Sequence, residues 1–191
     1  MSATANTFDL ESKLNRAIYA TIISTGTGKP GNTFAGYVDS ENRPIPNTTI
    51  ISGEGEEEYG LGNYRFFGKI IFRDSATLQP EMSNPRQPFL DAQNRTSSII
   101  SQLVQSDGSS EMEVSRSLIN SAGRAMAVDP TNGANQIFSD LALANADMID
   151  FTIIYWRIIA YGSVKSTKST GNTNYERETL FEALCCNSNV D

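Results

Sequence analysis

The chain has 191 residues, of which 15 are Lys or Arg, 22 are Asp or Glu and none is His, so its formal net charge is −7. This balance opposes a main surface that neutralises nucleic-acid phosphates, and the missing histidines exclude Ser-His-Asp, Cys-His and histidine-metal catalysis. The longest apolar run, Phe151 to Tyr161, has 11 residues, against about 20 for a membrane-spanning helix. The N-terminal residues also lack a signal-peptide pattern, so we expect the protein to stay in the cytoplasm after synthesis.

The first predicted element is an amphipathic helix over Asp9 to Ile23. Its apolar residues recur at helical spacing and form one stripe: Leu10, Leu14, Ala17, Ile18 and Ile22. From Ser24 to Asn47 the sequence is rich in Gly, Pro, Thr and Asn. That span is much longer than the four to six or so residues that usually join two elements. We therefore expect a long loop over 24–47, with a hairpin around Thr33 to Val38.

Two strands are predicted next, a short one over Thr48 to Ser52 and a long one over Asn63 to Arg73. An acidic connection punctuated by glycines joins them. Alternate positions of the long strand are apolar and should line the core: Tyr64, Phe66, Ile70 and Phe72. The opposite positions mix apolar and basic residues, so we expect that face to be half covered: Arg65, Phe67, Lys69, Ile71 and Arg73.

The second half of the chain begins with a helix that starts near Pro88 and runs through about Gln105. A weaker helical pattern follows over Met112 to Met126. The segment Phe151 to Tyr161 is apolar on both faces, which predicts the central strand of a sheet. A polar loop should follow it, and Tyr175 to Cys186 fits either an edge strand or a final helix.

This order of elements predicts an α+β fold. We expect a mixed or antiparallel sheet with two or three helices packed on one face. The whole chain, residues 1–191, should form a single domain. Its long loop extensions are expected near 24–47, 105–117 and 162–174.

The acidic connection supplies the first candidate site residues: Glu54, Glu56, Glu57 and Glu58. They lack the spacing of a calcium loop, so a solvated charge run is the simplest interpretation. Alternatively, they pair with Arg65, Lys69 or Arg73 of an adjacent copy, or present negative charge to a passage. All of these residues are therefore candidates for a subunit interface or a lumen.

Other polar residues suggest little chemistry. Arg157 lies in an apolar strand, which indicates either an interface or buried ion pair, or an arginine that reaches solvent at a sheet edge. Asp147 and Asp150 could form an acid-base pair, although a cap or a strand-end turn explains them better. Cys185 and Cys186 are neighbours and should be two free thiols. We expect no cofactor, no metal and no catalytic residue.

The pattern of these elements resembles the tail terminator family, the small tail-completion proteins of long-tailed bacteriophages and prophages. Four blocks carry the resemblance: the helix Asp9 to Ile23, the acidic block GEGEEEYGLGNYRFFGKIIF, the helix Phe89 to Leu103 and the strand DFTIIYWRIIAY. An acidic turn followed by Gly62, Asn63, Tyr64 and Arg65 is the most specific part. The block from Asp107 to Asn135 has no counterpart.

The resemblance implies a structural virion protein without enzymatic activity. Such a protein forms a closed ring, commonly of six subunits, that caps the tail tube and meets the head-tail connector, with DNA passing through the lumen without specific binding. It would assemble in the host cytoplasm and end in the neck or tail of the virion.

Two alternatives remain open at this stage. One is another non-catalytic tail or neck component, such as a tube subunit or a head-completion adaptor. The other is a cytosolic enzyme that depends on carboxylates, with Asp147, Asp150 and Glu54 as first suspects.

Overall fold

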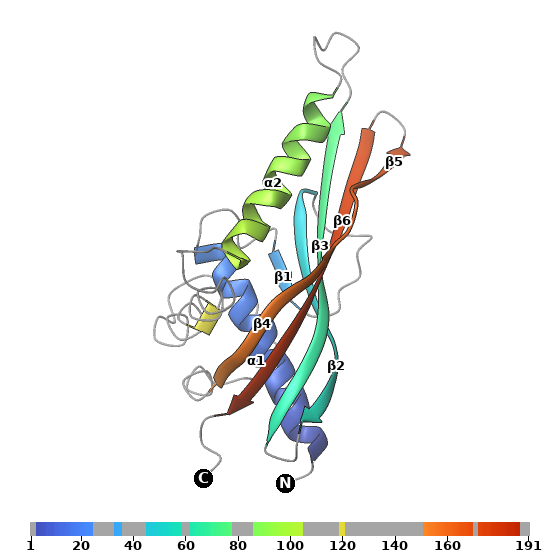
Figure 1. The fold of residues 1–191 in the computed structure, drawn as a ribbon. Helices are drawn as coiled ribbons and strands as arrows, with labels where there is room; N and C mark the ends of the chain where they lie inside the picture. Colours follow the sequence, from blue (N-terminus) through green and yellow to red (C-terminus); the bar gives the residue numbers. More distant parts are fainter. Residues whose placement is uncertain are drawn as a thin grey trace, which may run out of the picture.

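The computed structural model describes residues 3–24, 33–35, 45–58, 62–77, 86–104, 119–120, 151–169 and 172–187. Within these ranges the chain forms two long helices and six strands (Figure 1). In chain order they are α1 (Ala3–Ser24), β1 (Thr33–Ala35), β2 (Asn47–Glu58), β3 (Asn63–Thr77), α2 (Gln87–Leu103), β4 (Phe151–Tyr161), β5 (Lys165–Ser169) and β6 (Asn172–Asn187). α2 begins and ends close to where the sequence predicts it, whereas α1 ends as predicted but begins six residues before the predicted Asp9.

The strands form one sheet in the order β1-β2-β3-β6-β4, and β5 also pairs with β6. Only the short β1 runs parallel to its neighbour; the other pairs are antiparallel. β4 and β5 pair with successive parts of β6, so together they flank most of its length. The expected α+β class with a mixed sheet is therefore correct.

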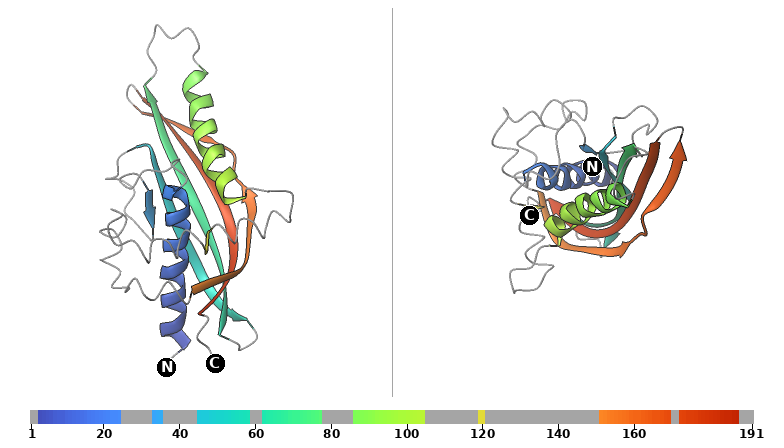
Figure 2. Two further views of the ribbon diagram at one scale, coloured as in Figure 1. Left: turned by 90° about the vertical axis from the view of Figure 1, so that its left-hand side faces the viewer. Right: turned by 90° about the horizontal axis from the view of Figure 1, so that it is seen from above.

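Both helices lie on one side of the sheet, which curves around them (Figure 2). α1 packs mainly against β2 and β1, and α2 packs against β3. An ion pair between Arg95 of α2 and Asp74 of β3 ties the second helix to the sheet. The other side of the sheet carries neither helix, and we call it the helix-free face.

α1 is less amphipathic in the structure than its sequence indicates. Its predicted apolar stripe is fully buried, but so are the polar residues between Ser12 and Ile22, including Lys13 and Arg16. Some of the polar side chains of α1 form hydrogen bonds with a side chain of the sheet. Asn15 donates a hydrogen bond to the Ser52 hydroxyl at 2.8 Å, and that hydroxyl donates to the Glu11 carboxylate at 2.7 Å.

The expectation that Phe151 to Tyr161 is the central strand is wrong. β4 has the predicted bounds but is the last strand of its sheet, and β6 lies between β3 and β4. The apolar run misled the prediction because part of it faces outward: Ile159 is 45% exposed and Tyr161 is 50% exposed. The ambiguous segment Tyr175 to Cys186 belongs to β6 and is therefore a strand.

Three segments expected to be loops or connections are also partly strands. The acidic stretch extends β2 to Glu58, because its backbone continues the ladder with β3 after a bulge between Ser52 and Gly55. The polar segment 162–174 contains β5 and the start of β6, and these two strands pair antiparallel, with Ser169 opposite Asn172 and Thr167 opposite Asn174. In the segment 24–47, Thr33 to Ala35 form β1, which pairs in parallel with β2. The rest of the expected hairpin, through Val38, lies outside the described residues.

Other expectations lie outside the described residues. These are the loop over 105–117 and most of the weak helix Met112 to Met126, of which Ile119 and Asn120 are helical. The single-domain expectation stays a prediction. Among the described helices, none is both long and apolar enough to cross a membrane.

Trp156 of β4 is one of the largest fully buried side chains of the core between helices and sheet. Its ring stacks on Phe181 with centroids 4.9 Å apart, and its Nε1 donates a hydrogen bond to the Leu103 carbonyl oxygen at 3.2 Å. The Phe181 ring in turn lies directly over Gly68, where any Cβ would overlap it. One aromatic pair thus joins β4, β6, β3 and the end of α2.

We predict that Trp156→Ala lowers the free energy of unfolding by about 3–5 kcal/mol, because it leaves a cavity. Trp156→Phe keeps an aromatic ring but removes the donor to the Leu103 carbonyl, so a smaller loss of about 1–2 kcal/mol is expected. Urea unfolding measures both. Leu90→Ala, at an exposed position of α2, is the control and should change stability by less than about 0.5 kcal/mol. Equal losses for the two Trp156 variants would contradict this account of the core.

Candidate functional site: the helix-free face of the sheet

The helix-free face is built from alternate residues of β3 and β6. Because side chains alternate along a strand, Phe66 and Ile70 of β3 and Phe181 of β6 are buried under the helices. The residues between them point to the other side. On β3 these are Arg65, Phe67, Lys69, Ile71 and Arg73, and on β6 they are Glu176, Glu178, Leu180, Glu182 and Leu184.

Charges on this face form two stripes of opposite sign. Arg73 Nε lies 2.7 Å from Glu176 Oε2, and Lys69 Nζ lies 3.2 Å from Glu178 Oε1. Arg65 Nη1 lies 3.5 Å from Glu182 Oε1. β3 therefore presents cations and β6 presents carboxylates, and each β3 cation has a β6 carboxylate beside it.

Glu182 is the most enclosed carboxylate of the face. Its side chain is only 5% exposed, and it also accepts a 2.7 Å hydrogen bond from Arg157 Nε of β4. The Arg157 guanidinium carbon lies 5.8 Å from the centre of the Tyr155 ring, and the Arg157 side chain is 54% exposed. Arg157 is thus ion-paired with Glu182 and also reaches solvent from the last strand of the sheet. The ion pair and the solvent-exposed edge position, which the sequence offered as alternatives, occur together.

Apolar side chains are exposed between these ion pairs. Phe67 is 43% exposed and Leu180 is 42% exposed. In the β3–β6 ladder Phe67 lies opposite Glu182, and Lys69 lies opposite Leu180, so the two apolar side chains are diagonal neighbours on one face. The expected half-covered character of this face is correct, with a small apolar centre and charged surroundings.

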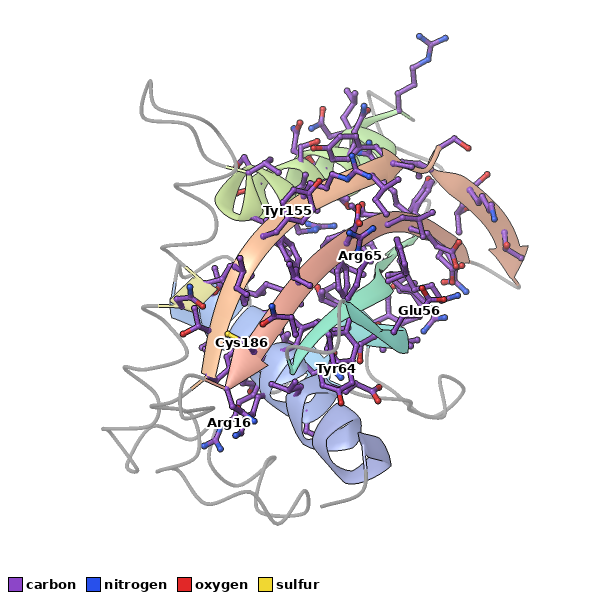
Figure 3. All side chains as sticks on the ribbon, turned by 60° about the horizontal axis from the view of Figure 1, so that its bottom comes forward. Arg16, Glu56, Tyr64, Arg65, Tyr155 and Cys186 are labelled. Atoms are coloured by element: carbon purple, nitrogen blue, oxygen red, sulfur yellow. The ribbon has the colours of Figure 1, made fainter. Side chains whose placement is uncertain are left out.

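The acidic candidates lie on β2, along the same sheet. Glu56 is opposite Arg65 in the β2–β3 ladder, while the backbones of Glu57 and Glu58 pair with Tyr64 and Asn63. Glu54 lies within the bulge. In Figure 3, Tyr155, Arg65 and Glu56 follow one another across the sheet from β4 to β2. The structure therefore brings Glu56 close to Arg65 within one chain.

Sequence reasoning did not identify the carboxylates of β6. Their signal is the spacing of Glu176, Glu178 and Glu182 in YERETLFEAL, which puts all three on one side of a strand. The uncertainty between strand and helix for this segment concealed that signal. Asp147 and Asp150, the suspects for a carboxylate enzyme, lie outside the described residues.

The two cysteines are free thiols on opposite sides of β6. Cys185 is in the core, where burial raises its pKa well above the usual value and the neighbouring Cys186 raises it further. Burial also raises the pKa of the half-buried Cys186. In the described part of the chain, no group of three or more Cys, Asp or Glu residues could hold a metal ion.

No protein-family model matches this chain, and no curated protein matches its sequence. The resemblance to tail terminators therefore stays a prediction based on the order of elements and the residues quoted for it.

We predict that Glu182→Ala destabilises the fold more than Glu178→Ala. Removing Glu182 leaves two arginines without their common carboxylate, although both are partly hydrated, so a loss of about 1–3 kcal/mol is expected. The more exposed Lys69–Glu178 pair should contribute less than about 1 kcal/mol. Urea unfolding of both variants at one pH measures the two losses. A larger loss for Glu178→Ala than for Glu182→Ala would contradict the role of Glu182 as the common partner of two arginines.

The thiols predict a pH effect with a defined sign. A thiol whose pKa is raised by folding stabilises the protein fully below the unfolded pKa, and this contribution is lost as the pH rises towards the folded pKa. Stability should therefore fall above about pH 9, and Cys185→Ala should make that fall shallower. In native protein, a thiol reagent should modify Cys186 slowly and Cys185 only after unfolding. Rapid modification of both would contradict the buried position of Cys185.

Proposed function

We propose that this chain is a structural subunit that assembles with copies of itself, and that its assembly is the ring of a tail terminator. The observation that carries self-assembly is the exposure of large apolar side chains on ordered strands. Phe67 and Leu180 are exposed on the helix-free face, and Ile154, Ile159 and Tyr161 are exposed on β4. Apolar groups gathered on ordered strands favour contact with another protein surface.

β4 is the best candidate for contact between neighbours in a ring. The register with β6 shifts between Ile153 and Tyr155 and again between Ile158 and Ala160, and each bulge leaves an exposed isoleucine. Tyr161 adds an aromatic ring, a side chain enriched at protein interfaces. A ring requires two different surface patches on each subunit, and β4 lies at one end of the sheet.

The order of elements supports the more specific part of the proposal. Among the described elements, α1, the end of β2 with β3, α2 and β4 follow one another in the order of the four blocks that resemble tail terminators. A ring through which DNA passes must also avoid retaining phosphate. The cations Lys69, Arg73 and Arg157 each have a carboxylate partner on β6, which reduces their attraction for a polyanion.

Electron microscopy and native mass spectrometry test the ring. We expect purified protein, alone or with tail tubes, to form a closed ring of six copies that sits once at the end of a tube. Isolated subunits on completed tails would contradict the proposal. Many copies along the tube would instead favour a tube subunit.

We further predict that Ile159→Ser combined with Tyr161→Ser prevents ring formation while leaving the fold intact. Both side chains are about half exposed, so unfolding in urea should change by less than about 1 kcal/mol. Leu90→Ser is the matched control, because Leu90 is 41% exposed but lies on α2. Rings of normal size from the β4 double variant would show that β4 is not the contact.

A further inference from the structure

We infer that the helix-free face pairs two copies of this chain about a two-fold axis that runs parallel to β3 and β6. The inference rests on the proposed self-association, but it concerns a different surface from β4. A two-fold contact closes after two copies and cannot by itself extend into a ring. The chain would thus have one contact for pairing and another for ring formation.

The charge pattern of the face points to a second copy as the occupant. Three cations on β3, Arg65, Lys69 and Arg73, stand beside three carboxylates on β6, Glu176, Glu178 and Glu182. The two stripes have equal and opposite formal charge, so they create no net field that would draw a polyanion. A surface with the same two stripes in reversed order would complement them, and another copy of this chain provides it.

Symmetry decides how the two copies meet. With the axis parallel to the strands and between β3 and β6, the β3 of one copy lies over the β6 of the other. Arg73 then faces Glu176 of the second copy, the counterpart of its own ladder partner. Lys69 and Arg65 face Leu180 and Leu184 of the second copy, each next to a carboxylate of the β6 stripe. With the axis in the plane of the face but perpendicular to the strands, β3 would lie over β3 and like charges would meet, which is unfavourable.

The shape of the sheet limits the contact to these central strands. Since the sheet curves around the helices (Figure 2), its helix-free face is convex, and two such faces touch along their middle. Phe67 and Leu180 lie there. The proposed axis brings Phe67 of each copy over β6 of the other, beside Leu180, so that the apolar groups of both copies come together and charged residues surround them.

The apolar centre is tested with Phe67→Ser combined with Leu180→Ser, and Leu90→Ser is the control because its exposure is similar on the helix side. Sedimentation velocity over a concentration series gives the dissociation constant of the pair. The double variant should raise it about tenfold or more, and the control should leave it unchanged. An unchanged constant in the double variant would overturn the inference, provided that circular dichroism and urea unfolding match the wild type.

The stripes are tested by exchanging their charges within one chain, with Lys69→Glu, Glu178→Lys, Arg73→Glu and Glu176→Arg combined. Each cation still has a carboxylate beside it, so the exchanged protein should fold and pair with itself. It should not pair with wild type, because like charges would then face each other. Fluorescence energy transfer between labelled wild type and labelled exchanged protein measures this, and free mixing of the two would contradict the proposed axis.

These results separate the inference from the proposed function. If rings form but the face variants change no association, the inference is wrong and the ring proposal stands. If the face variants abolish pairing while no ring forms under any condition, the inference stands and the ring proposal is wrong. If the wild-type protein is monomeric under all conditions, both are wrong.

Discussion

The ion pairs between the carboxylates of β6 and the cations of β3 and β4 are the interaction on which this architecture depends. They allow a strand with charged residues at alternate positions to lie in the middle of the sheet. On its other side the same strand contributes Phe181 to the core, stacked on Trp156. β6 thus has one face that is apolar beneath the helices and one face that is charged but locally neutral.

This arrangement also determines what the helix-free face can do. A sheet face with isolated cations would attract phosphate, and an entirely apolar face would aggregate. Here the charges are matched in pairs and Phe67 and Leu180 are exposed between them. The resulting surface suits a partner that is apolar at its centre and striped in charge. These properties are the basis of the assembly function proposed for this chain.

The sequence predicts much of the fold where the period of apolar residues is unambiguous. The helices near Asp9–Ile23 and Phe89–Leu103, the strand Phe151–Tyr161 and the core face of β3 all follow from spacing. The position of β4 could not be predicted, because exposed apolar residues such as Ile159 look the same in sequence as buried ones. β5 and the acidic end of β2 were missed because their residues are polar although their backbones pair in the sheet. For the candidate site, Arg65, Lys69 and Arg73 could be found from β3 alone, whereas their partners required the register of β6.

The most direct test of the central claim is hydroxyl-radical footprinting of the protein at low and high concentration. If the helix-free face is the pairing surface, oxidation of Phe67 and Leu180 should fall as the protein associates, while oxidation of Leu90 should stay constant. Constant oxidation of Phe67 and Leu180 across the association, or an equal decrease at Leu90, would contradict the claim that the ion-paired face of the sheet is a contact between copies.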